Sequence, residues 1–169
     1  MSYKREAYYG KINSRDWSLY LVATENGLCF VGSPNEAFDE VKNWFTKKRP
    51  EATLIEDWDK VATYAEELVE YFNGERQAFD VSVDFMGTTF QESVWTELQH
   101  IPYGEKWTYT DIAENIGKPN AVRAVGAAIG ANPVMIVVPC HRVVGKNGEM
   151  TGFRGGIPTK ERLLELENS

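Results

Sequence analysis

Residues 131–143 read ANPVMIVVPCHRV, a run of mostly apolar residues that ends in PCHRV. The apolar residues 134–138 predict a buried strand, with Cys140 close to its end. A cysteine in that position is most often a small, inert core residue. Here His141 follows at once, and a thiol becomes a nucleophile when a base or nearby cations favour its thiolate. The stretch is therefore interpreted either as core or as a catalytic Cys140–His141 pair.

The backbone expected around Cys140 complicates a direct proton transfer to His141. Adjacent residues of an extended segment point to opposite sides, so a bent backbone or a bridging water would be needed. A carboxylate on the far nitrogen of His141 would complete a relay of Cys, His and Glu. Glu167, at the end of the last predicted helix, is a candidate. Its spacing alone favours a solvated carboxylate at a helix end.

Upstream of this stretch, two short predicted helices cover residues 110–116 and 121–131, with Gly117 in the turn between them. This is the pattern of a helix-turn-helix. The second helix carries one cation, Arg123, and is otherwise almost bare of long side chains. A recognition helix in the major groove needs long hydrogen-bonding side chains, so a bare face with one arginine fits the minor groove better. Close packing of the small residues against neighbouring helices is the alternative. These small residues are Ala121, Ala124, Gly126, Ala127, Ala128, Gly130 and Ala131.

The whole chain predicts two domains, residues 1–85 and 86–169. The first domain reads as α/β, with an Asn26-Gly27 hairpin turn between two strands. Its predicted strands are residues 8–12, 17–23, 28–31 and 79–85. One predicted helix begins at Pro34, and a second covers residues 58–72. The second domain reads as mainly helical. It begins with a helix capped by Thr88 or Thr89 and ends with a helix over residues 159–167.

The charge of the chain is a weak guide to its partners. Its 169 residues carry a formal net charge of −7, which taken as an average argues against nucleic acid. The charge is unevenly distributed, however. Residues 1–98 hold 10 Lys+Arg and 18 Asp+Glu, whereas residues 115–163 hold 7 and 2. The basic segment contains both Arg123 and Cys140.

The numbers and positions of cysteine and histidine indicate the redox environment of the protein and limit the metal sites it could form. Cys29 and Cys140 lie far apart in different surroundings, which predicts reduced thiols in a cytoplasmic protein. With two Cys and two His, no usual zinc-ligand spacing can be assembled, so no metal site is predicted.

No apolar run approaches the roughly 18 to 20 residues of a membrane helix. Residues 1–6 lack the apolar segment of a signal peptide.

Residues 131–143 resemble the active-site segment of the O6-alkylguanine–DNA alkyltransferases, also called methylated-DNA–protein-cysteine methyltransferases. The resemblance covers roughly residues 86–167, about half the chain. The other matching segments are Gly87-Thr88-Thr89-Phe90-Gln91, Val94-Trp95, Ile101-Pro102-Tyr103-Gly104, Tyr109, Arg123-Ala124-Val125-Gly126, Gly148, Gly152-Phe153, Gly155-Gly156, and residues 160–164 with Glu167. The resemblance implies a ribonuclease H-like N-terminal domain before a helical domain with a helix-turn-helix.

The resemblance also implies a role for each matching catalytic position. Cys140 would be the nucleophile that takes the alkyl group from the O6 atom of guanine. His141 would be its base, acting through a water, and Glu167 would orient His141. Asn132 would join the recognition helix to the active-site strand. Tyr109 would help to rotate the nucleotide and would donate a proton to the guanine ring.

The DNA-binding positions follow in the same way. The recognition helix, with Ala121, Ala124 and Gly126, would enter the minor groove of double-stranded DNA. Arg123 would fill the space left by the flipped base, and Tyr109 would contact the DNA as well. The substrate pocket implied by the resemblance consists of Val143, Ile129, Phe153 and Arg154. Animal members carry Ser at the position of Arg154, which leaves the tolerance of bulky alkyl groups open.

The expected activity is an irreversible, single-turnover transfer by a monomer that needs no cofactor and binds no membrane. The alternative is a non-catalytic alkyltransferase-like protein, which binds alkylated DNA and recruits other repair. Such proteins carry another residue, commonly Trp, at the cysteine position, so Cys140 disfavours this alternative. A plain helix-turn-helix transcription factor is disfavoured by the bare recognition helix.

Overall fold

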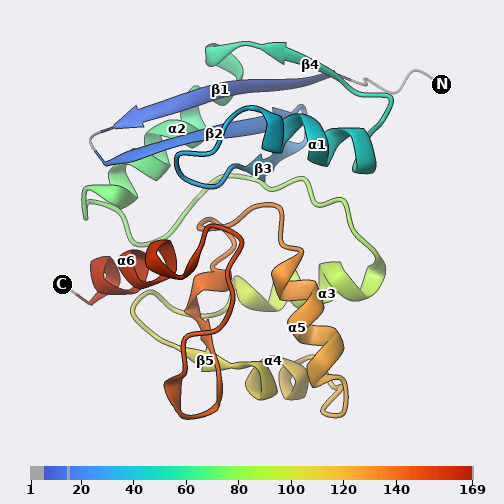
Figure 1. Ribbon diagram of the computed structural model, residues 1–169, viewed down its shortest axis with the longest axis vertical. Helices are drawn as coiled ribbons and strands as arrows, with labels where there is room; N and C mark the ends of the chain where they lie inside the picture. The colour runs from blue at the N-terminus through green and yellow to red at the C-terminus, as the bar shows by residue number, and fades with distance from the viewer. Residues whose placement is uncertain (1–5, 15, 169) are drawn as a thin grey trace. The chain divides into compact units, whose positions relative to one another are not determined.

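The computed structural model describes residues 6–14 and 16–168. Residues 1–5, which make up most of the segment judged not to be a signal peptide, lie outside the described residues. The chain divides into two compact units, Met1–Met86 and Gly87–Ser169, and Figure 1 labels their helices and most of their strands. Within the described ranges, no helix has the length and apolarity needed to cross a membrane.

The first unit is built on a four-stranded sheet in the order β3-β2-β1-β4. Its strands are β1 (Glu6–Ser14), β2 (Trp17–Thr24), β3 (Gly27–Val31) and β4 (Thr53–Glu56). β2 pairs antiparallel with both β1 and β3, and β4 pairs parallel with β1. The four-residue β4 was not predicted from the sequence. It is short and half-exposed, so it carries little of the apolar pattern on which such a prediction depends.

Helices lie against both faces of this sheet. α1 (Asp39–Lys48) contributes Val41 and Phe45 to a buried cluster with Ala7 of β1. α2 (Trp58–Phe72) packs on β1 at Gly10, where an added Cβ would lie 2.7 Å from Val61. Residues 7 and 10 of a strand point to opposite faces, so the two helices cover opposite sides. The α2 prediction is confirmed from end to end.

Two local predictions for the first unit are wrong, and a third is displaced by one residue. The predicted hairpin forms, but its loop is Glu25-Asn26, because Thr24 already pairs with Gly27. The helix expected from Pro34 begins only at Asp39, because the Glu40 carboxylate accepts bonds from the Ser33 backbone and hydroxyl and holds the preceding loop. The strand expected at residues 79–85 does not form, although half-buried and exposed residues alternate as predicted from residue 79 to residue 83. This segment meets β3 through one bridge, between Leu28 and Val83.

The second unit is mainly helical. Its elements are α3 (Thr89–Leu98), β5 (Trp107–Thr108), α4 (Tyr109–Asn115), α5 (Val122–Gly130), the 3-10 turns η1 (Cys140–Arg142) and η2 (Lys146–Gly148), β6 (Val143–Val144) and α6 (Ile157–Glu167). Thr88 caps α3 and Thr108 caps α4, each in a reciprocal capping box. The helix-turn-helix prediction is confirmed as α4 and α5, which pack on each other.

Two contacts connect this helical pair to its surroundings. The indole nitrogen of buried Trp95, on α3, donates to the carbonyl of Ala128 on α5 at 2.8 Å. The short strands β5 and β6 pair in parallel, with Trp107 opposite Val143. The start of α4 is therefore held beside the segment that follows Cys140.

The strand predicted at residues 134–138 does not form. Ile136 has a φ of +75°, and the Val138 amide donates back to the Val134 carbonyl at 3.0 Å. All five residues are buried. The apolar run is thus a compact coil, and Cys140 begins a 3-10 turn instead of continuing an extended segment.

Candidate active site

Asn132 holds the coil in front of Cys140. Its Nδ2 donates to the Val138 carbonyl at 3.0 Å, and its Oδ1 accepts from the Val134 amide at 2.9 Å. The side chain is buried, so both bonds are protected from water. The amide of Cys140 then donates to the same Val138 carbonyl at 2.8 Å. Because Asn132 lies just beyond the end of α5, this clamp ties the position of Cys140 to that helix.

Cys140 is nearly inaccessible, with 6 % of its surface exposed. Burial raises the pKa of the Cys140 thiol, because an unsolvated thiolate is costly. An interaction with Asn132 and the charges of Arg154 and Lys160 lower the pKa, but burial dominates. The resting sulfur is therefore a thiol, and a nucleophilic reaction needs a base to take its proton.

His141 is fully buried and paired with a carboxylate. Its Nε2 lies 2.7 Å from Oε2 of Glu167. Burial lowers the pKa of His141, and although Glu167 acts in the opposite direction, burial is the larger effect. A neutral imidazole that donates from Nε2 to the carboxylate leaves Nδ1 as its basic nitrogen. The side chain is thereby prepared to accept a proton.

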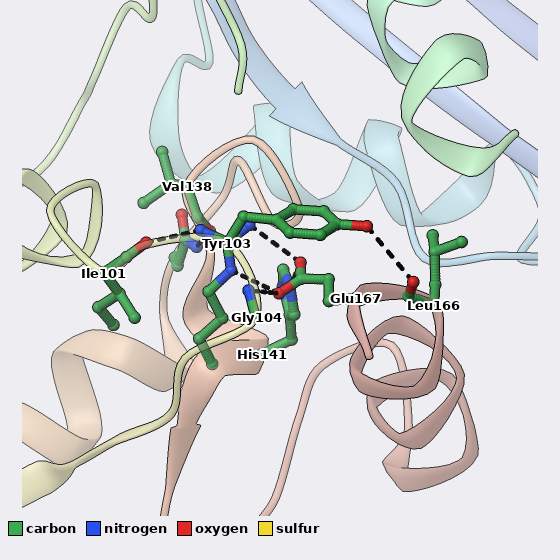
Figure 2. Close-up of polar contacts among 9 residues, drawn as sticks. Ile101, Tyr103, Gly104, Val138, His141, Leu166 and Glu167 are labelled. Carbon is green, nitrogen blue, oxygen red and sulfur yellow. Dashed lines mark hydrogen bonds and ion pairs between the residues drawn. The ribbon is translucent and has the colours of Figure 1, made fainter. Parts of the chain in front are cut away.

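The Glu167 carboxylate joins three segments of the second unit. Arg142 donates to it from Nε at 2.8 Å and from Nη2 at 2.9 Å, in the bidentate geometry typical of strong Arg–carboxylate pairs. The amide of Gly104 donates to Oε1 at 3.2 Å. Figure 2 shows Glu167 directed toward both His141 and Gly104. The prediction from sequence spacing alone, that Glu167 is a solvated carboxylate, is wrong, because 1 % of its side chain is exposed.

The same network extends to the turn before β5. Nη1 of Arg142 donates to the Ile101 carbonyl at 2.7 Å. The hydroxyl of Tyr103 donates to the Leu166 carbonyl at 3.3 Å (Figure 2). The first bond attaches the turn at residues 101–104 to η1, and the second attaches it to the end of α6. They fix the carboxylate that orients His141.

Cys140 opens into a small cavity of about 40 Å³. Most residues expected at the site meet there. Its lining includes Tyr109, Gly126, Ile129, Asn132, Cys140, Phe153 and Arg154. Val143 is fully buried in β6, and its carbonyl accepts a hydrogen bond from Nζ of Lys160 at 2.6 Å. A cavity of this size suits a small group beside the sulfur.

The outer face of α5 carries short side chains and one long side chain, Arg123. Arg123, Ala124 and Ala127 are exposed, whereas Val125, Ala128 and Ile129 face the interior. Ala121 and Gly126 are half-buried. A Cβ added at Gly126 would lie 3.7 Å from the ring of Tyr109. The backbone of α5 thus lies directly beside the cavity entrance, and a flat surface can approach it closely.

The family of the chain follows from comparison with known proteins. Residues 89–169 match the family model described as the DNA binding domain of 6-O-methylguanine DNA methyltransferase, and residues 7–85 match its ribonuclease-like domain. The chain belongs to the 6-O-methylguanine DNA methyltransferase family. Both predicted fold classes, the N-terminal α/β domain and the helical C-terminal domain, are confirmed.

Individual members of the methyltransferase family are similar over nearly the whole chain. The inducible methylated-DNA–protein-cysteine methyltransferase of Bacillus subtilis is 51 % identical over 97 % of this chain and 92 % of its own length. That of Methanosarcina acetivorans is 42 % identical, over 96 % and 99 %. The crystal structure of Mycobacterium tuberculosis OGT in complex with DNA superposes with a TM-score of 0.80 at 41 % identity, covering 95 % of this chain and 92 % of that one.

Two buried cations of this family member were not predicted as site residues. Arg142 stands in the sequence as part of the PCHRV motif, and Lys160 stands among the residues that resemble the alkyltransferases. A signal for Lys160 was present, because residues 160, 163, 164 and 167 follow the i, i+3, i+4, i+7 spacing of one helix face. That face is buried, so Lys160 and Glu167 share the interior with Leu163 and Leu164.

Replacing Glu167 tests the carboxylate at the centre of the network. Glu167→Gln removes the anion and leaves the Arg142 guanidinium buried without its charge partner. We expect the free energy of unfolding to fall by about 3–5 kcal/mol, measured by urea denaturation. Glu165→Gln, on the exposed side of α6, is the matched control and should stay within about 0.5 kcal/mol of the parent. A loss below about 1 kcal/mol for Glu167→Gln would mean that the pair behaves like a solvated one.

Thiol labelling tests the protonation state of Cys140. Because burial raises the pKa of this thiol, its thiolate fraction should rise about tenfold per pH unit through neutral pH. The rate of iodoacetamide labelling at Cys140, followed by mass spectrometry, should rise in proportion. Cys29 is fully buried with a pKa raised to about 12, so it should react only after unfolding. A labelling rate at Cys140 that does not change with pH would show a resting thiolate and contradict this assignment.

Proposed function

We propose that this chain repairs DNA by flipping O6-alkylguanine out of the duplex and transferring the alkyl group irreversibly to Cys140. One observation carries this proposal: a buried cysteine opens into a small cavity and is followed by a histidine whose Nε2 lies 2.7 Å from a buried carboxylate. The names of the relatives, which state methyl transfer between DNA and a protein cysteine, support it.

The chemistry begins with proton removal from the Cys140 thiol. Neutral His141 accepts this proton through a bridging water, and Glu167 stabilises the resulting imidazolium. The sulfur then attacks the alkyl carbon in line, so that the S–C bond forms as the C–O6 bond breaks. The electron pair of the broken bond moves into the guanine ring, where Tyr109 delivers a proton. The product is a thioether, which is not readily hydrolysed, so each molecule acts once and no cofactor takes part.

Access to the base requires a flipped nucleotide, because the O6 atom lies inside the duplex. Extrusion costs a few kcal/mol, and Arg123 offsets part of it by filling the vacated stack. The short side chains on the outer face of α5 support binding in the minor groove, and the chain is expected to act as a monomer. We assign DNA binding and alkyl transfer to residues 86–169. The predicted cytoplasmic location is part of the same proposal.

Intact mass after incubation with an O6-methylguanine duplex tests the transfer. The parent chain should gain one methyl group, mapped to Cys140, in a stoichiometric reaction that then stops. Cys140→Ala should gain none, because the nucleophile is gone, and should still bind the duplex. Cys29→Ala, which removes the other buried thiol, is the matched control and should react like the parent. Binding by the parent without any mass gain would favour the non-catalytic alternative, and methyl transfer by Cys140→Ala would refute the assignment of the nucleophile.

The salt dependence of DNA binding tests how the basic segment is used. Of the seven cations in residues 115–163, Arg142 and Lys160 are buried and cannot reach phosphates. The other five are Lys118, Arg123, Lys146, Arg154 and Arg162. Each neutralised phosphate contributes about 0.9 to the slope of log K against log salt, so the slope should not exceed about 4.5 in magnitude. A steeper slope would require phosphate contacts outside this segment.

A further inference from the structure

Lys160 is a buried cation that the proposed chemistry does not use. Only 1 % of its surface is exposed. Its ammonium donates to the Val143 carbonyl at 2.6 Å, to Oγ1 of Thr151 at 3.1 Å and to the Thr151 carbonyl at 3.4 Å. These acceptors are uncharged oxygens, and burial lowers the pKa of Lys160. A charge held in this way is expensive, and the Cys140 thiolate is the group that raises the pKa of Lys160.

The hydroxyl of Thr151 connects this cation to Tyr109. Its Oγ1 lies 2.5 Å from the phenol oxygen of Tyr109. An ammonium group has donors only, whereas a threonine hydroxyl has one proton and two lone pairs. Thr151 therefore accepts from Lys160 and keeps its own proton available for the Tyr109 oxygen. Lys160, Thr151 and Tyr109 form a continuous chain of hydrogen bonds that ends at the cavity of Cys140.

The proposed reaction requires a hydrogen-bond donor to the Tyr109 oxygen, and this chain of hydrogen bonds provides one. When Tyr109 gives its proton to the guanine ring, its oxygen becomes an anion in a half-buried site. A donor must be in place for that oxygen at the moment of transfer, because reorganising the surroundings would slow the step. The Thr151 hydroxyl is within hydrogen-bond reach of the phenol oxygen, and the Lys160 ammonium polarises it from the other side.

We propose that Thr151 is a positioning residue that links Lys160 to Tyr109 and completes a proton relay to the departing guanine. The inference rests on the proposed alkyl transfer. In the relay, the Tyr109 proton goes to the guanine ring, the Thr151 hydroxyl proton goes to the Tyr109 oxygen, and one Lys160 proton goes to the Thr151 oxygen. The S–C bond forms and the C–O6 bond breaks in the same event.

The charges balance before and after this relay. Once His141 has taken the thiol proton, the Cys140 thiolate and the Lys160 ammonium carry opposite charges, and the His141 imidazolium is paired with Glu167. After the transfer the sulfur is a neutral thioether and Lys160 is a neutral amine, so these two buried charges disappear together and the imidazolium–carboxylate pair remains. Loss of the thiolate removes the interaction that raises the pKa of Lys160. The formation of the product therefore favours release of the Lys160 proton along the chain.

Single-turnover kinetics of the full chain on an O6-methylguanine duplex test the relay. Thr151→Val keeps the shape of the side chain but removes the hydroxyl, and should slow methyl transfer at saturating DNA about tenfold. Thr151→Ser restores a hydroxyl and should stay within about threefold of the parent rate. Affinity for an unmethylated duplex, measured by fluorescence anisotropy, should be unchanged within about twofold for both. Thr159→Val, next to Lys160 in sequence, is the matched control and should react at the parent rate.

A double-mutant cycle with Tyr109→Phe separates the relay from a merely structural role for Thr151. Without the phenol hydroxyl there is nothing for Thr151 to assist, so adding Thr151→Val to Tyr109→Phe should cause no further loss of rate. Equal fold losses in both backgrounds, or a serine variant as slow as the valine variant, would overturn the proposal. If the valine variant unfolds, Thr151→Ala repeats the test, because alanine removes the hydroxyl without placing a γ-methyl group beside Tyr109 and Lys160. A parent chain that transfers no methyl would refute the proposed function itself, whereas a parent-like Thr151→Val would refute the relay alone.

Discussion

The buried carboxylate of Glu167 is the interaction on which the site depends. It lies at the end of α6, yet it pairs with His141, with Arg142 and with the backbone of Gly104. An isolated carboxylate would not stay ionised at this depth, and an isolated guanidinium would be equally costly. Together they form a compact pair, and Nη1 of the guanidinium also donates to the Ile101 carbonyl. The pair ties α6, the 3-10 turn at Cys140 and the turn at residues 101–104 into one rigid frame.

This frame explains how a poorly reactive thiol is compatible with nucleophilic chemistry. Burial raises the pKa of Cys140 and lowers that of His141, so the resting pair is a neutral thiol beside a neutral base. Neither group carries a charge until the substrate is present. Asn132 restrains the coil before the cysteine, and Glu167 restrains the imidazole after it. The geometry is therefore set before the charges develop, which limits the cost of reorganisation during the reaction.

Much of the second unit could be predicted from local patterns. The caps at Thr88 and the short helices around Gly117 depend on residues close together in sequence, and they form as expected. The prediction of a strand at residues 134–138 was wrong, because a run of apolar residues indicates burial but does not specify the backbone conformation. Here the positive φ of Ile136 and the Asn132 side chain turn that run into a coil. Lys160 and Arg142 were missed because lysine and arginine are rarely buried unless paired, and their partners are distant in sequence.

The sequence by itself determined the family and the two fold classes, and it named the residues proposed to carry the chemistry, because the motif around Cys140 is local and specific. Only the tertiary structure decided how those residues meet. Glu167 lies 26 positions from His141, and Thr151 lies 42 positions from Tyr109. Distances of that kind depend on how α6 and the loop before it pack on the rest of the unit. Packing is set by the sum of many weak apolar contacts, which no short stretch of sequence records.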